Sequence, residues 1–162
     1  MATYRVAIVG CGARAAAHIE SYRYLPNTRV VACCDPNPER REMISTQYNI
    51  TGYADADEML RAEGPDIVQL VTWPKTRVEL MTLVSEYQIP MCVVEKPIAL
   101  GVEDWRDLRH IAAVTRTKFA VSHQVRWQEQ LKQCEQALRS GWNSITARLK
   151  RDAALDRDGE AR

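Results

Sequence analysis

Three short segments carry residue types that could do chemistry, and each directly follows an apolar run. They are the glycine turn Gly10-Cys11-Gly12-Ala13-Arg14-Ala15, the acidic residue Asp35 and the tripeptide Glu95-Lys96-Pro97. Short apolar runs followed by such residues are typical of buried parallel strands, whose carboxyl ends meet at one edge of a sheet. A glycine turn, a carboxylate and an ammonium at one such edge can hold a dinucleotide and act on a hydroxyl beside it.

The glycine turn has the residues that a dinucleotide pyrophosphate requires. Gly10 permits a tight turn, Gly12 lets the backbone approach the phosphates, and Ala15 permits close packing of the next helix on the strand. Ala13 and Arg14 open that helix, whose N-terminal N–H groups favour an anion. A glycine turn in another kind of strand–helix unit remains the alternative, because this motif alone is not specific.

Asp35 lies 20 residues after Ala15, where an acidic residue accepts a hydrogen bond from the 2′-hydroxyl of the adenosine ribose. Its carboxylate would repel a 2′-phosphate, which favours NAD over NADP. Arg40 and Arg41 keep NADP possible, because a nearby arginine can accommodate that phosphate. Asp35 also begins the turn sequence Asp-Pro-Asn-Pro, and a turn role and a ribose role are compatible.

Alternating strands and helices must position these residues. The patterns predict strands over residues 4–9, 29–34, 52–54, 66–71, 91–94 and 118–122. They predict helices over residues 13–24, 38–48, 57–62, 75–87, 102–114 and 127–138. Strands that alternate with such helices indicate an α/β fold, a doubly wound parallel sheet of the Rossmann type.

The chain length of 162 residues fits one such domain, which we expect over residues 1–140. Residues 141–162 are expected to be the start of a truncated second domain or a disordered tail. The last part of this segment, residues 150–162, is mostly charged and lacks apolar periodicity.

Charge and cysteine content exclude several classes of protein. The 22 Lys and Arg nearly balance 21 Asp and Glu, which argues against nucleic acid as a partner. The apolar runs are too short to cross a bilayer, and no signal peptide is evident. Five cysteines without a C-x-x-C pair predict reduced, buried thiols in a cytoplasmic protein and no metal site.

The order of glycine turn, Asp-Pro-Asn-Pro and Glu-Lys-Pro resembles the Gfo/Idh/MocA family of NAD(P)-dependent oxidoreductases, over roughly residues 3–145. The resemblance implies an N-terminal Rossmann domain and a C-terminal α/β domain that is missing from this chain. It also implies a sugar, an inositol or a nucleotide sugar as substrate, and a homo-oligomer where the second domain is present.

Within that family pattern, Lys96 would lie beside the nicotinamide and the substrate, and Pro97 would match a proline that is often cis. An ammonium at the carboxyl end of a parallel strand can hold a substrate hydroxyl and favour the developing alkoxide, so Lys96 is the predicted catalytic residue. Glu95 would hold a ribose hydroxyl of the cofactor or pair with a charge. The alternative is that the Lys-Pro turn is an ordinary surface turn without a role in binding or catalysis.

Two further matches are less regular. Thr72 and Trp73 leave the fourth predicted strand and would line the nicotinamide side of the pocket, unless Trp73 packs under the next helix. The family usually reads Thr-Pro there, followed by a His whose place is taken here by Arg77. Gln124 and Arg126 follow the sixth strand, where the family often has an Arg near the cofactor or the second domain.

Two functions therefore remain open for the chain. It is the cofactor half of a dehydrogenase that transfers hydride between NAD(P) and a sugar or polyol, or it is a non-redox NAD-binding sensor on the same scaffold. The family's acid–base pair usually lies in the second domain, and this chain has no His after His123. We therefore expect little or no turnover from the chain alone.

Overall fold

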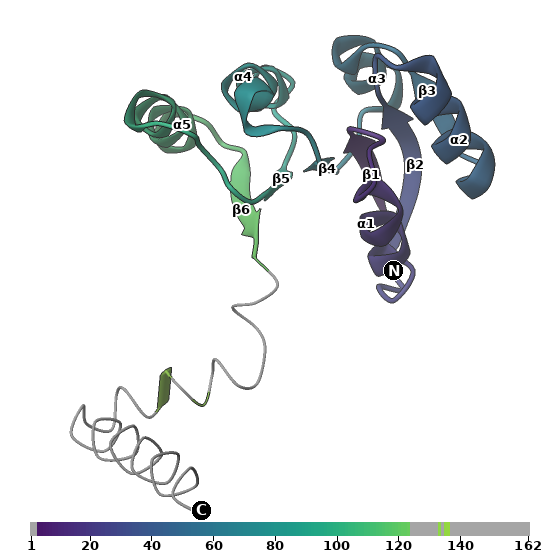
Figure 1. Ribbon diagram of the computed structural model, residues 1–162, viewed down its shortest axis with the longest axis horizontal. Helices are drawn as coiled ribbons and strands as arrows, with labels where there is room; N and C mark the ends of the chain where they lie inside the picture. Colours follow the sequence, from purple (N-terminus) through teal and green to yellow (C-terminus); the bar gives the residue numbers. More distant parts are fainter. Residues whose placement is uncertain (1–2, 124–132, 134, 137–162) are drawn as a thin grey trace, which may run out of the picture. The chain divides into compact units, whose positions relative to one another are not determined.

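Six parallel strands form a single sheet in the computed structural model, which describes residues 3–123 together with Gln133, Glu135 and Gln136. The strands lie in the order β3-β2-β1-β4-β5-β6, and every neighbouring pair is parallel (Figure 1). Their bounds are Tyr4–Val9 (β1), Thr28–Cys34 (β2), Thr51–Tyr53 (β3), Ile67–Leu70 (β4), Met91–Glu95 (β5) and Lys118–Ser122 (β6).

Helices connect the strands, as the predicted alternation requires. They are Ala15–Tyr22 (α1), Pro38–Tyr48 (α2), Ala56–Glu63 (α3), Arg77–Glu86 (α4) and Val102–Val114 (α5), with a 3₁₀ turn over Pro74–Thr76. The prediction of a doubly wound Rossmann sheet is therefore confirmed. The predicted helix 13–24 begins two residues later, because the glycine turn continues through Arg14, and the predicted helix 75–87 is divided by the 3₁₀ turn.

Local sequence explains where the helices begin and end. Pro38 is the first residue of α2, and the side chain of Asn37 accepts a hydrogen bond from the N–H of Arg40 at 3.0 Å. Asp55 caps α3 in the same way, and Gly64 ends that helix in a left-handed conformation at φ 49°.

Two apolar clusters cover the two faces of the sheet. Val6 and Ile8 pack with α1 and α2, whereas Ala7 and Val9 face the cluster that α3, α4 and α5 complete. Figure 1 shows α3, α4 and α5 along the upper side of the strands and α1 on the lower side. Because β1 is buried on both faces, it reads in the sequence as an uninterrupted apolar run.

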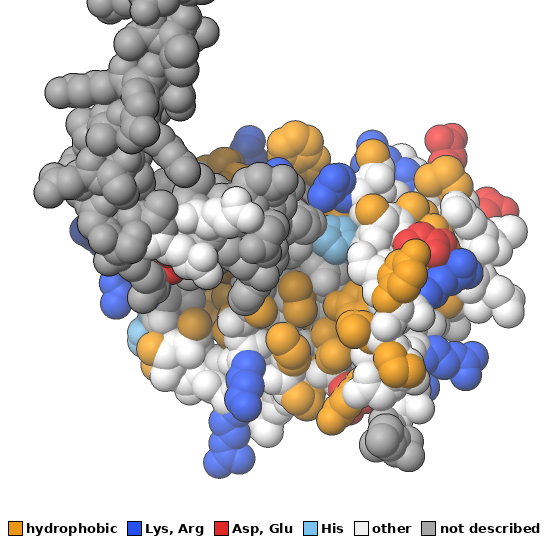
Figure 2. All heavy atoms as spheres, turned by 90° about the horizontal axis from the view of Figure 1, so that it is seen from below, with side chains coloured by type: hydrophobic (Ala, Val, Ile, Leu, Met, Phe, Trp, Pro, Cys, Tyr) orange, Lys and Arg blue, Asp and Glu red, His pale blue; other side chains and the backbone are white. Residues whose placement is uncertain are grey.

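The lower face of the sheet is covered only in part by the described helices. The cluster on the α1 and α2 side includes no residue of β5 or β6. Figure 2 looks at this lower side and shows hydrophobic side chains gathered near its centre, with Lys and Arg toward the margin. Within the described part of the chain, no helix is long and apolar enough to span a bilayer.

Four of the five cysteines are described, and all four are buried free thiols, as predicted. The chain divides into two units, residues 1–122 and residues 123–162. The predicted domain boundary at residue 140 lies outside the described residues. Of the predicted helix 127–138, the structure describes only Gln133, Glu135 and Gln136, which are helical.

Candidate functional site

The glycine turn lies at the carboxyl end of β1, between β2 and β4, where the strand order of the sheet reverses. Gly10 has a φ of +97°, and a Cβ there would lie 3.0 Å from the backbone carbon and oxygen of Val71. Only glycine fits this position without strain. Gly12 differs, because a Cβ there would meet no atom within 4 Å, so the backbone at Gly12 faces open space.

The N-terminus of α1 begins directly at this open side. Ala15 is fully buried against the sheet, as predicted for the third position of the motif, and its N–H bonds to the carbonyl of Gly12 at 2.9 Å. Ala13 and Arg14 are exposed, and no acidic residue lies in the first turn of α1. The helix end therefore presents backbone N–H groups and a positive dipole end without a competing carboxylate.

The Asp35 carboxylate holds the glycine turn in place through a backbone hydrogen bond. Its Oδ2 accepts the N–H of Cys11 at 2.8 Å, and its Oδ1 accepts the N–H of Asn37 at 2.9 Å. Asp35 is only 7% exposed. An ionised carboxylate offers about four acceptor positions, so two bonds leave capacity for a ribose hydroxyl. The turn role predicted for Asp35 is thus present, and it is compatible with the ribose role.

Asp35 also lines a cavity of about 420 Å³ that opens beside the glycine turn. Gly10, Gly12, Thr72 and Trp73 line the same cavity, and the exposed Arg40 lies on its wall. The cavity thus brings together residues from the ends of β1, β2 and β4. Its carboxylate and guanidinium are the two groups that the sequence predicted to decide between a ribose hydroxyl and a ribose phosphate.

Arg77 holds the segment that follows β4 through hydrogen bonds to its backbone. This side chain is fully buried, and its guanidinium donates hydrogen bonds to the carbonyls of Leu70 at 3.2 Å and Thr72 at 2.9 Å. Burial lowers the pKa of Arg77, and the nearby Cys92 and Glu95 side chains oppose that shift. Arg77 therefore shapes the backbone at the site instead of lining the cavities.

Trp73 is 83% exposed, so it does not pack under the next helix. It lines the cavity at Asp35 and a second cavity of about 480 Å³ on the side of β5. A large exposed indole between two cavities is available to a ligand and lies outside the core.

The second cavity contains the Glu-Lys-Pro turn that follows β5. Its walls include Gly12, Arg14, Trp73, Glu95 and Lys96. Lys96 is exposed, whereas Glu95 is only 5% exposed. The peptide bond between Lys96 and Pro97 is cis, as the family resemblance implied. Ala13, Thr72 and Pro97 also line this cavity.

A buried contact that sequence reasoning missed lies behind this turn. Nε2 of His18, on α1, lies 2.8 Å from Oε1 of Glu95, an ion-pair distance, although the two atoms do not meet hydrogen-bond geometry. His18 is only 8% exposed. Burial lowers its pKa, with help from Arg14, while Glu95 opposes the shift.

Two further predicted residues, Gln124 and Arg126, fall outside the described residues. In the described ranges, no group of three His, Cys, Asp or Glu side chains is placed to hold a metal ion.

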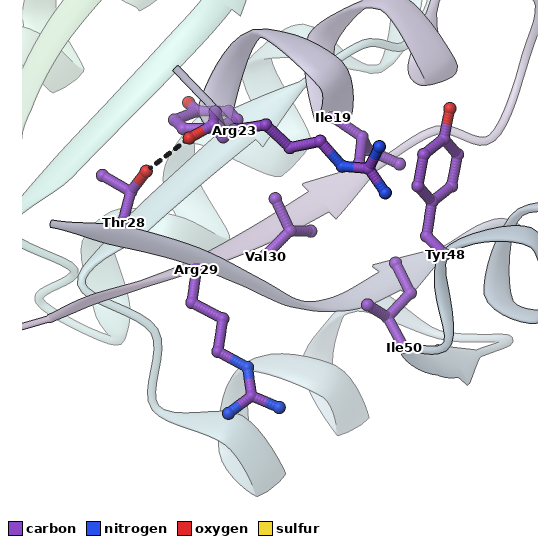
Figure 3. A pocket seen from close by; sticks show the side chains of 8 residues that line it. Ile19, Arg23, Thr28, Arg29, Val30, Tyr48 and Ile50 are labelled. Atoms are coloured by element: carbon purple, nitrogen blue, oxygen red, sulfur yellow. Dashed lines mark hydrogen bonds between the residues drawn. The ribbon is translucent and has the colours of Figure 1, made fainter. Parts of the chain in front are cut away.

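Another cavity, of about 190 Å³, opens at the amino end of β2 (Figure 3). Arg23 lies over the ring of Tyr48 at 5.8 Å on one side of it, and Arg29 points away from Val30 to the other side of the strand. Ligands of open α/β sheets bind at the carboxyl ends of the strands, so this cavity lies at the wrong edge for a dinucleotide.

Comparison with known proteins agrees with this geometry. The sequence profile of an oxidoreductase family with an NAD-binding Rossmann fold, GFO_IDH_MocA, matches residues 4–123. The chain is 30% identical over 141 residues to a D-apiose dehydrogenase of Paraburkholderia graminis, covering 85% of this chain and 37% of that protein.

Solved structures show the same fold at lower identity. The WlbA dehydrogenase from Bordetella pertussis, in complex with NADH and UDP-GlcNAcA, superposes with a TM-score of 0.81 at 23% identity, over 86% of this chain and 42% of that one. An oxidoreductase from Agrobacterium radiobacter in complex with NAD+, L-tartaric acid and magnesium gives 0.78 at 23% identity, over 85% and 40%. The chain thus spans about two fifths of these relatives. It belongs to the Gfo/Idh/MocA oxidoreductase family, whose NAD-binding Rossmann domain it contains.

Proposed function

We propose that this domain binds NAD across its two adjoining cavities and serves as the cofactor half of a dehydrogenase acting on a CH–OH group of a sugar, an inositol or a nucleotide sugar. The position of Lys96 carries the proposal. Its ammonium is exposed on the wall of a cavity that also contains the open backbone at Gly12. A site for phosphates and a cation for a reacting oxygen therefore share one cavity.

The residues present fit a dinucleotide. The space beside Gly12, which a Cβ would enter freely, suits the pyrophosphate, and the N-terminus of α1 faces it. Asp35 would accept the adenosine ribose hydroxyl in the cavity that it lines. Glu95 would accept a hydroxyl of the second ribose in the other cavity, and Trp73 would border the nicotinamide.

Bound nicotinamide supplies the acceptor for a hydride from the substrate's carbinol carbon. Lys96 would donate a hydrogen bond to the hydroxyl oxygen and stabilise the negative charge that develops there as a general base of the substrate domain accepts the hydroxyl proton. Trp73, at the mouth of the cavity, would cover an apolar face of the substrate. The relatives reported above include a sugar dehydrogenase and a nucleotide-sugar complex, which supports this class of substrate.

Calorimetry with NADH and NADPH tests cofactor binding by the 162-residue chain. We expect NADH to bind at least about tenfold more tightly, because Asp35 repels a 2′-phosphate. Absence of binding by the folded chain would contradict the proposal, and tighter binding of NADPH would contradict the role of Asp35.

Lys96→Met separates catalysis from cofactor binding, since it keeps much of the side-chain length and removes the charge. We expect NADH affinity to stay within about tenfold, or roughly 1.4 kcal/mol. In an enzyme that joins this domain to a substrate domain, kcat/KM should fall by about 100-fold or more. Unchanged turnover would favour the non-redox sensor, and loss of NADH binding alone would make Lys96 a cofactor anchor.

A further inference from the structure

His18 and Glu95 form a buried contact between two elements that are far apart in the sequence. His18 comes from the second turn of α1, and Glu95 is the last residue of β5. Their side chains are 9% and 7% exposed, and Nε2 lies 2.8 Å from Oε1. A carboxyl group this deeply buried is costly unless polar or charged groups surround it, and His18 is one such group.

The contact also favours one state of the imidazole. Burial and the charge of Arg14 lower the pKa of His18, whereas Glu95 opposes that shift, so the neutral ring prevails near pH 7. A carboxylate oxygen at 2.8 Å favours the tautomer whose proton is on Nε2. The electrostatic attraction between that N–H and Oε1, at this short distance, restricts the orientation of the carboxylate.

Only one member of the pair faces the candidate site. Glu95 lines the cavity that holds Lys96, whereas His18 is not among its lining residues. An effect of His18 on a ligand in that cavity must therefore pass through Glu95. His18 also lies on the helix whose N-terminus faces the pyrophosphate site, so the contact links the phosphate end of the cavity to the Glu-Lys-Pro turn.

We propose that His18 is a positioning residue that holds the Glu95 carboxylate where it accepts a hydroxyl of the nicotinamide-side ribose. The proposal rests on the proposed binding of NAD by this domain. It assigns His18 to the nicotinamide half of the cofactor and gives it no part in binding the adenosine half, which lies toward Asp35.

Comparison of NADH with ADP tests this assignment, because ADP carries only the adenosine and pyrophosphate half. Calorimetry on the 162-residue chain would use His18→Leu, His18→Gln, Glu95→Gln and the double variant His18→Leu/Glu95→Gln. Glutamine can place an N–H donor near the position of His Nε2, whereas leucine cannot. His110→Leu is the matched control, since His110 is exposed on α5.

For His18→Leu, we expect the Kd for NADH to rise about tenfold and the Kd for ADP to stay within about twofold. His18→Gln should recover most of the NADH affinity, and His110→Leu should change neither ligand. Adding His18→Leu to Glu95→Gln should cause no further loss, because a residue that acts through Glu95 has nothing left to position.

Equal losses for NADH and ADP in His18→Leu would overturn the proposal and make His18 a structural residue of α1. Unchanged NADH affinity in His18→Leu, or additive losses in the double variant, would overturn it too. If the unsubstituted chain binds ADP and NADH equally, Glu95 does not touch the second ribose and the inference fails while nucleotide binding stands. If it binds neither, the proposed function itself fails.

Discussion

The two glycines of the turn should respond to substitution in opposite ways. Gly10 has a φ of +97° and lies where a Cβ would meet backbone atoms of Val71 at 3.0 Å. Gly12 has neither constraint, since no atom lies within 4 Å of its Cβ position. Gly10→Ala should therefore damage the fold, whereas Gly12→Val should leave the fold intact and remove the space that the pyrophosphate needs.

The magnitudes follow from these contacts. A side chain at a strained φ costs about 1–3 kcal/mol, and the close backbone of Val71 must also shift, so Gly10→Ala should lower the free energy of unfolding by about 3 kcal/mol. Gly12→Val should change it by less than about 0.5 kcal/mol. Loss of one charge-assisted hydrogen bond to the pyrophosphate costs about 1.5–3 kcal/mol, so the Kd for NADH should rise about 100-fold in Gly12→Val.

Urea unfolding measures the stability of each variant, and calorimetry measures NADH binding by the folded protein. Gly101→Val is the matched control, because its Cβ would also enter open space but Gly101 lines neither cofactor cavity. It should leave NADH affinity unchanged. Folded Gly12→Val that binds NADH like the unsubstituted chain would refute the placement of the pyrophosphate. Gly10→Ala of normal stability would refute the steric argument at Val71.

Three further predictions concern the same domain. Asp35→Ala should lower the free energy of unfolding by about 2 kcal/mol in urea titrations, because the buried N–H of Cys11 loses its acceptor. It should also weaken NADH binding. Unchanged stability would show that Asp35 does not hold the glycine turn in place. Burial raises the pKa of Cys34 and Cys92 from 9.0 to about 12. These thiols ionise earlier in the unfolded chain, so between pH 9 and 12 stability should fall by about 1.4 kcal/mol per pH unit for each thiol, and Cys92→Ala should remove its share of that slope. The 162-residue chain should produce no NADH above background with a panel of sugars and inositols, and robust turnover would show that Lys96 or another group of this chain suffices for acid–base catalysis.

The fold could be predicted because its signals are local. A strand buried on both faces reads as an apolar run, so β1 was placed at its observed bounds from the sequence alone. The helices α2 and α5 were also predicted at their observed bounds, and Pro38 marks the start of α2. The start of α1 was misplaced by two residues, because an alanine-rich segment does not reveal where a glycine turn ends.

The wall of the site could be predicted for a related reason. Parallel strands bring their carboxyl ends to one edge, so residues just after each strand converge whatever their separation in the sequence. The described site residues that the sequence predicts line one of the two cavities, with three exceptions: Ala15, Arg41 and Arg77. The contacts behind the wall could not be predicted, because the orientation of His18 toward Glu95 depends on how α1 packs on the sheet.

Arg77 shows how such hidden contacts bear on a departure from a family pattern. Arg77 stands where the family often has a His. It could contact a ligand directly only if its side chain were exposed. Arg77 is instead fully buried, and two of its nitrogens bond to the carbonyls of Leu70 and Thr72. A buried cation that satisfies two backbone carbonyls fixes the path of the chain into Trp73. The replacement of that His by Arg77 therefore affects the backbone of the segment that carries Trp73. Trp73, and not Arg77, is the side chain exposed to a ligand.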